Sequence, residues 1–157
     1  MPSRRAEIAM TPEEQAQFLR DGHTLMLVTI GPDGVPDPVP MWYVVDGAGT
    51  ILMRTFTKSQ KIVNLKRDPR YAALVEAGER YAELRGVQLT GTAELFEDPD
   101  LILDTLMGLA TKYEDAAFEH IPALREAARP AVAKMTGIRL VPDKVATWDH
   151  RKLGGGF

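Results

Sequence analysis

The chain has no cysteine among its 157 residues. This absence excludes disulfide bonds, thiolate metal ligands and a cysteine nucleophile, and it makes a cytoplasmic location the expectation. Long apolar runs are also missing, because no stretch approaches the roughly 18 residues that a membrane-spanning helix requires. No G-x-S-x-G motif is present, so the sequence gives no support to serine-nucleophile chemistry.

The composition is otherwise that of a globular protein, with 45% apolar and 26% charged residues. A chain of this length suits one domain, so residues 1–157 are expected to fold as a single unit. The net charge of −3 argues against general nucleic-acid binding. No two of the three histidines, His23, His120 and His150, have a spacing typical of metal ligands, so no metal site is predicted.

The most informative segment is Thr50–Arg70, TILMRTFTKSQKIVNLKRDPR. It begins as a strand at Ile51–Thr55 and continues through a hydroxyl-rich turn into a short helix at Ser59–Lys66, with Ser59 as the expected N-cap. Asp68-Pro69 ends the helix, because the residue before a proline is disfavoured in helical geometry. A strand end, a polar turn and a helix N-terminus therefore meet at one place.

This segment is basic although the whole chain is acidic. Between positions 54 and 70 there are six basic residues and one acid, Asp68. The basic residues are Arg54, Lys58, Lys61, Lys66, Arg67 and Arg70. Free N–H groups, the helix dipole, hydroxyls and cations at one corner suit a phosphate group. The alternative is that these are solvated side chains on a short surface helix, and the residues alone leave both interpretations open.

Most of the remaining chain has the pattern of strands. Thr11-Pro12 begins a helix to about Arg20, and His23–Ile30 is apolar enough to predict a strand buried on both faces. Strands are also predicted at Pro38–Val45, Tyr71–Ala77 and Leu84–Phe96. The prolines of PVPMWYVV lack amide donors, so its first half is expected at a sheet edge or in a bulged section, with backbone groups free for a ligand.

A helical insertion is predicted at about residues 99–134, starting at Asp98-Pro99. It is followed by a closing strand pair, Ile138–Val141 and Lys144–Trp148, around Pro142-Asp143. The glycine-rich tail after Arg151 is expected to be irregular. About six or seven strands, mostly joined as hairpins, predict a mainly β fold, an antiparallel barrel with peripheral helices.

Four stretches together resemble the split-barrel flavin-binding superfamily typified by pyridoxamine 5′-phosphate oxidase. They are PVPMWYVV, RTFTKSQKIVNLKRDPR, LRGVQLTGTAEL and VATWDHRKL, and the similarity covers nearly the whole chain. Within the superfamily, the chain looks most like the actinobacterial branch that uses the deazaflavin coenzyme F420. One departure is the GGGF end, which replaces the basic, proline-containing signature of the vitamin-forming oxidases. Pyridoxamine phosphate oxidation itself is therefore not expected.

The resemblance implies a homodimer with two cofactor sites at the subunit interface. It places Arg54 and Thr55 beside the flavin ring and ribityl chain, and Pro40, Met41 and Trp42 on the strand that lines the ring. Thr57, Lys58, Ser59 and Lys61 would bind the phosphate. Trp148, and with it Arg151 and Lys152, would approach from the partner subunit. No catalytic side chain is assigned, because solvent can supply the proton.

Three functions follow from this comparison. The first is an F420-dependent oxidoreductase that transfers hydride from the reduced deazaflavin to a conjugated small molecule. The second uses FMN on the same fold, since both cofactors carry a phosphate after a ribityl chain. F420 adds a polyglutamate tail, which the surplus of Lys58, Lys66, Arg67 and Arg70 favours. The third is a non-catalytic protein that carries a flavin or F420.

Overall fold

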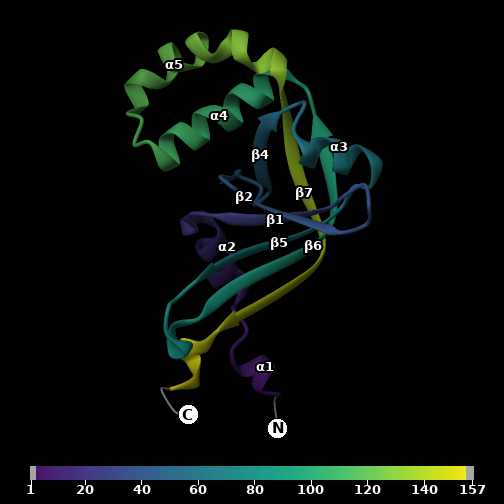
Figure 1. Cartoon of the computed structure of the whole chain (residues 1–157). Helices are drawn as coiled ribbons and strands as arrows, with labels where there is room; N and C mark the ends of the chain where they lie inside the picture. The colour runs from purple at the N-terminus through teal and green to yellow at the C-terminus, as the bar shows by residue number, and fades with distance from the viewer. Residues whose placement is uncertain (1–2, 155–157) are drawn as a thin grey trace.

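The computed structural model describes residues 3–154. Their strands form one antiparallel sheet with the order β2-β1-β5-β6-β7-β4-β3 (Figure 1). The strands are β1 (Leu25–Ile30), β2 (Pro36–Met41), β3 (Val44–Val45), β4 (Ile51–Phe56), β5 (Arg70–Ala77), β6 (Arg85–Phe96) and β7 (Met135–Asp149). The expected mainly β, antiparallel split-barrel architecture is thus confirmed.

The two edges of the sheet are consecutive in the chain. β2 and β3 lie at opposite ends of the strand order, yet only Trp42 and Tyr43 separate them. The sheet therefore has to curl until its edges meet, which produces the half-barrel. The predicted strand Pro38–Val45 is thus two strands with a break, and its proline-rich half lies at an edge, as its missing amide donors require.

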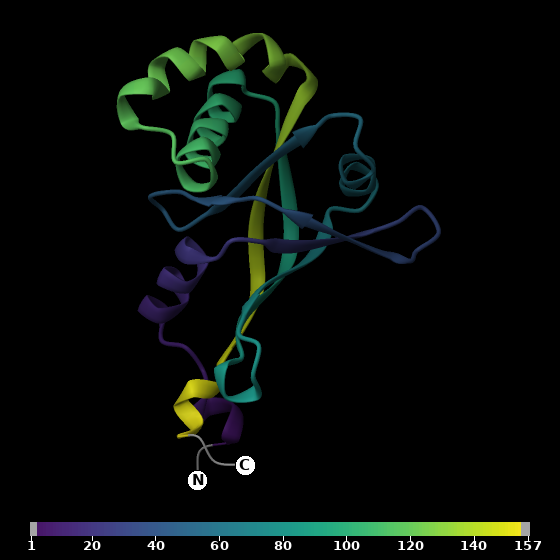
Figure 2. The same cartoon turned by 60° about the vertical axis from the view of Figure 1, so that its left-hand side comes forward.

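Two long strands run the length of the molecule (Figures 1 and 2). β6 pairs with β7 from Arg85↔Asp149 to Phe96↔Gly137, with a bulge at Thr90/Gly91. The predicted closing hairpin is wrong, because Ile138–Val141 and Lys144–Trp148 belong to the single strand β7. Its Pro142 is tolerated because it lies at the irregularity opposite Gly91, outside the regular ladder.

The main core lies inside the curl of the sheet. Leu25, Leu27, Tyr43, Met53 and Ile138 are among its fully buried side chains. β1 alternates between buried and partly exposed positions. The prediction of a strand buried on both faces is therefore wrong, since every second side chain of β1 stays at least partly exposed. The alternation is not visible in the sequence, because the exposed positions of β1 also carry apolar residues such as Met26.

Helices lie around the sheet. They are α1 (Arg4–Glu7), α2 (Pro12–Asp21), α3 (Gln60–Arg67), α4 (Pro99–Tyr113) and α5 (Ile121–Ala128). Short 3-10 turns are η1 (Tyr81–Glu83), η2 (Phe118–His120), η3 (Arg129–Lys134) and η4 (His150–Leu153). The start of α2 carries a full capping box between Thr11 and Glu14, which explains its sharp beginning. No helix among residues 3–154 is long and apolar enough to cross a membrane.

The helical insertion occurs where it was predicted and packs over β4 and β7 through α4. The buried residues of α4 are Ile102, Leu103, Thr105, Met107 and Leu109. A small second core forms where α4 meets η3 and Met135. The tail is also more regular than expected, because η4 continues to Leu153. Residues 155–157 of the predicted irregular tail lie outside the described range.

Candidate cofactor site

The predicted phosphate corner forms where β4 passes into α3. β4 ends at Phe56, residues 57–59 turn, and α3 begins at Gln60 with Ser59 as its N-cap residue. The first N–H groups of a helix have no acceptor within the helix, and they carry the positive end of its dipole. The side chain of Ser59 makes no capping hydrogen bond to them. The Ser59 hydroxyl is therefore not used as a cap, and it lies at the same corner as the first amides of α3.

Three predicted side chains meet at this corner. The Thr55 hydroxyl donates to the Ser59 hydroxyl at 3.4 Å, and Lys61 Nζ lies 3.5 Å from Thr55 Oγ1. All three residues are partly exposed. Two hydroxyls, an ammonium group and a helix N-terminus within one small space are a donor set that fits a phosphate monoester. We call Thr55, Ser59 and Lys61 the phosphate corner.

Thr57 and Lys58 are not part of this contact. The Thr57 hydroxyl is paired with that of Thr136 at 2.8 Å, and its N–H donates to the Lys134 carbonyl at 2.9 Å. These bonds fix the turn to the start of β7. Lys58 is exposed at the tip of the turn. Lys58 can add positive charge near the phosphate corner, but it does not line the corner.

Arg54 lies on the other face of β4. Side chains alternate along a strand, so Arg54 and Thr55 point to opposite sides of the sheet. Arg54 is half-buried, and its Nε has no hydrogen-bond partner in the described part of the chain. Burial lowers the pKa of its guanidinium, and the nearby Glu114 carboxylate partly offsets that effect. The structure therefore separates Arg54 from the phosphate corner.

Two of the surplus cations are already engaged. Arg67 donates to the Ile30 carbonyl and to the Asn64 side chain, and Arg70 forms an ion pair with Asp68 at 2.7 Å. The Arg70 guanidinium holds the pKa of Asp68 down at about 2. Lys58 and Lys66 remain exposed. Fewer cations are thus available for a polyglutamate tail than the sequence suggested.

The strand expected to line a ring ends in an aromatic cluster. Trp42 is 45% exposed and stacks on Tyr113, with ring centroids 4.5 Å apart and planes within 6°. The Tyr113 hydroxyl accepts from the Tyr43 N–H and donates to the Tyr43 carbonyl, both at 3.1 Å. The His23 ring meets Tyr113 edge-on at 5.1 Å. Sequence reasoning missed Tyr113, because nothing local links the end of α4 to this strand break.

The other two residues of that strand differ in access. Pro40 is exposed on the edge strand, whereas Met41 is buried in the core. Any contact of Met41 with a ring must therefore involve its backbone. That agrees with the expectation that the proline-rich edge offers main-chain groups to a ligand.

Trp148 lies at the far end of β7. Thr136 of β7 pairs with Thr55, whereas Trp148 pairs with Gly86. Twelve residues separate the two positions on the strand, which corresponds to roughly 40 Å of extended chain. Arg151 and Lys152 are at the same far end, paired with Asp149 and Glu14. One chain therefore does not bring Trp148, Arg151 or Lys152 to the phosphate corner.

Known proteins place this architecture in a family. The family model described as pyridoxamine 5′-phosphate oxidase matches residues 11–149. The chain belongs to this family of flavin- or F420-binding split barrels. A comparison with curated proteins finds no match.

Solved structures agree on the fold. A conserved hypothetical protein of Mycobacterium tuberculosis, Rv2991, is 39% identical over 99% of this chain and 95% of its own, with a TM-score of 0.87. A protein described as an F420 reductase is 26% identical over 87% of this chain and 98% of its own, with a TM-score of 0.63. HutZ, a heme storage protein from Vibrio cholerae, is 17% identical over 87% of this chain and 94% of its own, with a TM-score of 0.63, and shows the fold alone.

Proposed function

We propose that the protein is an F420-dependent oxidoreductase that reduces a conjugated small molecule. The observation that carries the proposal is the phosphate corner, where Thr55, Ser59 and Lys61 meet at the N-terminus of α3. Its donor set suits the phosphate that F420 and FMN both carry. The similarity to an F420 reductase favours the deazaflavin.

The chain's own part in this reaction is to hold and orient. The Lys61 ammonium and the two hydroxyls neutralise and hydrogen-bond the phosphate, while the α3 amides complete its cradle. The edge strand β2 and the exposed face of Trp42 offer a surface against which a ring can lie. We propose that Arg54, on the other face of β4, acts on charge in the ring rather than on the phosphate. The bound cofactor would supply the hydride transfer.

We further propose that the active form is a homodimer. The outer face of β1 exposes apolar side chains, with Met26 37% exposed, which suits burial against a second copy. The predicted contribution of Trp148 to the site also requires a partner, because within one chain it lies at the opposite end of β7. A single subunit would then bind the phosphate but leave the ring site incomplete.

The cofactor assignment has a direct test. Purified protein is titrated with F420 and with FMN, and binding is followed by the fluorescence of each cofactor. We expect F420 to bind with a micromolar or lower dissociation constant and FMN more weakly. Tight FMN binding with weak F420 binding would instead favour the FMN-dependent alternative, and failure of both to bind would remove the proposal.

Turnover separates the reductase from a carrier. The protein loaded with reduced F420 is offered a panel of enones, quinones and tetrapyrroles, and oxidation is followed by the return of deazaflavin absorbance. We expect at least one substrate to accelerate this return. Tight binding of the cofactor with no acceleration by any member would support a non-catalytic carrier.

The composite site can be tested by subunit mixing. Lys61→Ala and Trp148→Ala are each expected to lose cofactor binding in their own homodimers. A heterodimer of the two carries one site with both changes and one site with neither. Mixing should therefore restore binding to about half the sites of the mixed dimers. No recovery in verified heterodimers would place both residues in one subunit's site, and unchanged binding in the Trp148→Ala homodimer would exclude Trp148 from it.

A further inference from the structure

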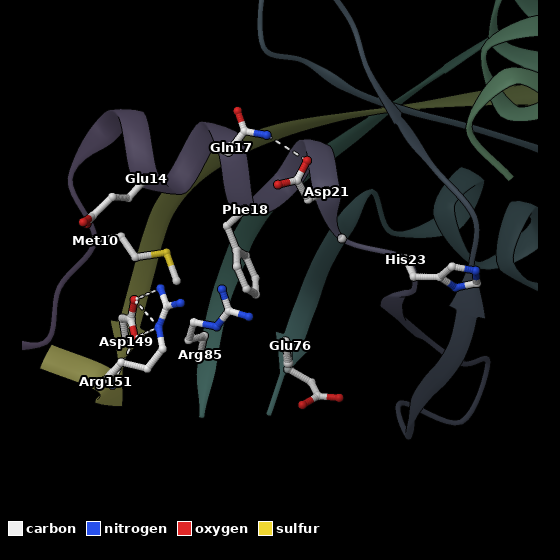
Figure 3. A pocket seen from close by; sticks show the side chains of 12 residues that line it. Met10, Glu14, Gln17, Phe18, Asp21, His23, Glu76, Arg85, Asp149 and Arg151 are labelled. Carbon is white, nitrogen blue, oxygen red and sulfur yellow. Dashed lines mark hydrogen bonds and ion pairs between the residues drawn. The ribbon is translucent and has the colours of Figure 1, made fainter. Parts of the chain in front are cut away.

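A pocket opens on the face of the sheet that α2 covers, and Trp148 lies on the opposite face. It lies between α2 and the ends of β5, β6 and β7 and has a volume of about 520 Å³ (Figure 3). Met10, Phe18 and Ala77 contribute apolar surface, and Arg85, Asp149 and Arg151 contribute charge. We call it the α2 pocket. Its size is within the range of pockets that bind small molecules.

The register of the sheet separates this pocket from the predicted ring site. Arg85 pairs with Asp149, so these two side chains share the face that α2 covers. Trp148 pairs with Gly86, and adjacent residues on a strand point to opposite faces. The α2 pocket and the Trp148 indole are therefore on opposite sides of the same two strands.

Three of the four acids that line the pocket are already bonded, and Glu76, at the end of β5, is the fourth. Both carboxylate oxygens of Asp149, which is 4% exposed, accept from the Arg151 guanidinium, at 2.9 Å and 2.6 Å. Glu14 pairs with Lys152 at 2.6 Å, and Asp21 accepts from the Gln17 amide at 2.7 Å. Figure 3 shows the Asp149–Arg151 pair at one side of the pocket and the Gln17–Asp21 bond above it.

Arg85 forms no ion pair within residues 3–154, although its charge, after that of the Arg151 guanidinium, also lowers the pKa of Asp149. Its Nε is buried and has no hydrogen-bond acceptor among residues 3–154. The Arg85 Cζ lies over the Phe18 ring, 5.4 Å from the ring centroid. The planar fork of a guanidinium, with its N–H groups, can bind a planar oxyanion in a bidentate manner. A buried donor without an acceptor is costly, so a ligand that accepts from it gains affinity.

We propose that the α2 pocket binds a small monocarboxylate with an apolar body. The carboxylate would accept from the Arg85 guanidinium, and the apolar part would pack against Phe18 and Met10. One unpaired cation suits one negative charge, and the acidic rim of Glu14 and Asp21 disfavours a dianion such as a phosphate monoester. This ligand would be distinct from the cofactor, because it uses none of the residues of the phosphate corner.

The test is an NMR titration of the full-length chain. Two matched probes are used, 3-phenylpropanoate and its neutral amide, and amide shifts are followed at Gly22, Ala77 and Arg85. We expect the carboxylate to shift these signals with an affinity at least about tenfold above that of the amide, since only the ion gains charge-assisted bonds. Equal affinities for 3-phenylpropanoate and its amide, or no shifts at millimolar 3-phenylpropanoate, would overturn the proposal with the wild-type protein alone.

Variants then assign the contact. Arg85→Gln should weaken the carboxylate by at least about tenfold and leave the amide unchanged. Arg5→Gln removes the same charge from an exposed position on α1 outside the pocket lining, and it should change neither. Lys61→Ala should lower cofactor affinity but leave carboxylate binding intact, so failure of the cofactor proposal and failure of this one give different results. Carboxylate binding that survives Arg85→Gln would contradict the assignment.

Discussion

The side-chain amide of Asn64 donates to the Thr29 hydroxyl at 3.0 Å and to the Asp37 carboxylate at 3.1 Å. Its oxygen accepts from the Gln60 amide at 2.8 Å. Asn64 is fully buried, so these bonds join α3 to β1 and to the edge strand β2 in a place that water does not reach. The helix that carries the phosphate corner is therefore positioned by one amide group, in addition to Ile62 and Leu65 in the core.

Asn64→Ala should destabilise the protein by about 2–4 kcal/mol, because it leaves buried partners unsatisfied and opens a cavity under α3. Cofactor affinity should fall as well, since the helix N-terminus loses its anchor. Urea unfolding and cofactor titration measure the two effects. Lys66→Ala, at an exposed position of the same helix, is the control and should change stability by less than about 0.5 kcal/mol. A neutral Asn64→Ala would show that apolar packing alone holds α3.

A substitution at Gly86 tests the role of the Trp148 side chain in stability and in cofactor binding. A Cβ at position 86 would overlap the Trp148 indole, so Gly86→Ala must displace that ring. We expect a loss of about 1–3 kcal/mol in stability from overpacking, together with weaker cofactor binding if Trp148 serves the partner's site. Gly47→Ala is the matched control, because a Cβ there meets nothing within 4 Å and the change should be nearly neutral. Thermal unfolding and cofactor titration measure both variants.

The parts of the fold that sequence predicted are those set by local chemistry. Thr11-Pro12 begins α2, and Asp68-Pro69 ends α3. The errors concern long-range pairing. Pro142 looks like the centre of a turn, but β7 continues through it because Asp143, the extra residue between the pairs Thr90↔Lys144 and Gly91↔Pro142, forms a bulge there. The apolar run before Ile30 hid the alternation of β1, whose outer face stays partly exposed.

The phosphate corner was predictable for a similar reason. Thr55, Ser59 and Lys61 are close in sequence, so a strand, a turn and a helix bring them together in space. Arg54 was grouped with them by sequence proximity, but strand alternation places it on the other face. Tyr113 contacts Trp42, and Arg85 contacts Phe18. Both contacts join residues far apart in sequence, so no local pattern predicts them.

Comparison of FMN with riboflavin should distinguish Lys61 from Arg54. Lys61 lies at the phosphate corner, so Lys61→Ala should weaken FMN by at least about tenfold and leave riboflavin unchanged. Arg54 faces away from that corner, so Arg54→Gln should weaken both ligands by the same factor. Flavin fluorescence quenching measures each affinity. If Arg54→Gln reduced FMN binding selectively, Arg54 would have to reach the phosphate, contrary to its position on β4.

Lys112 predicts a pH dependence of stability. Its Nζ is buried without a hydrogen-bond partner among the described residues, 3.8 Å from the Tyr43 ring centroid. Burial lowers its pKa to about 8 from 10.5, and the Asp21 carboxylate offsets part of that shift. The attraction to the Tyr43 and Tyr113 ring faces also favours the charged form, but it does not replace the lost hydration.

The sign follows from proton counting. Below about pH 8 the amine is charged in both states, and the folded state bears the cost of burying it. Between about 8 and 10.5 the unfolded chain holds the proton while the folded chain releases it, so stability rises with pH in this window. Urea unfolding across this range should show the rise in the wild type and its absence in Lys112→Met. Lys66→Met, which removes an exposed lysine, should keep the wild-type profile. Parallel profiles for the wild type and Lys112→Met would mean that Lys112 keeps its proton in the folded protein, held by the two rings.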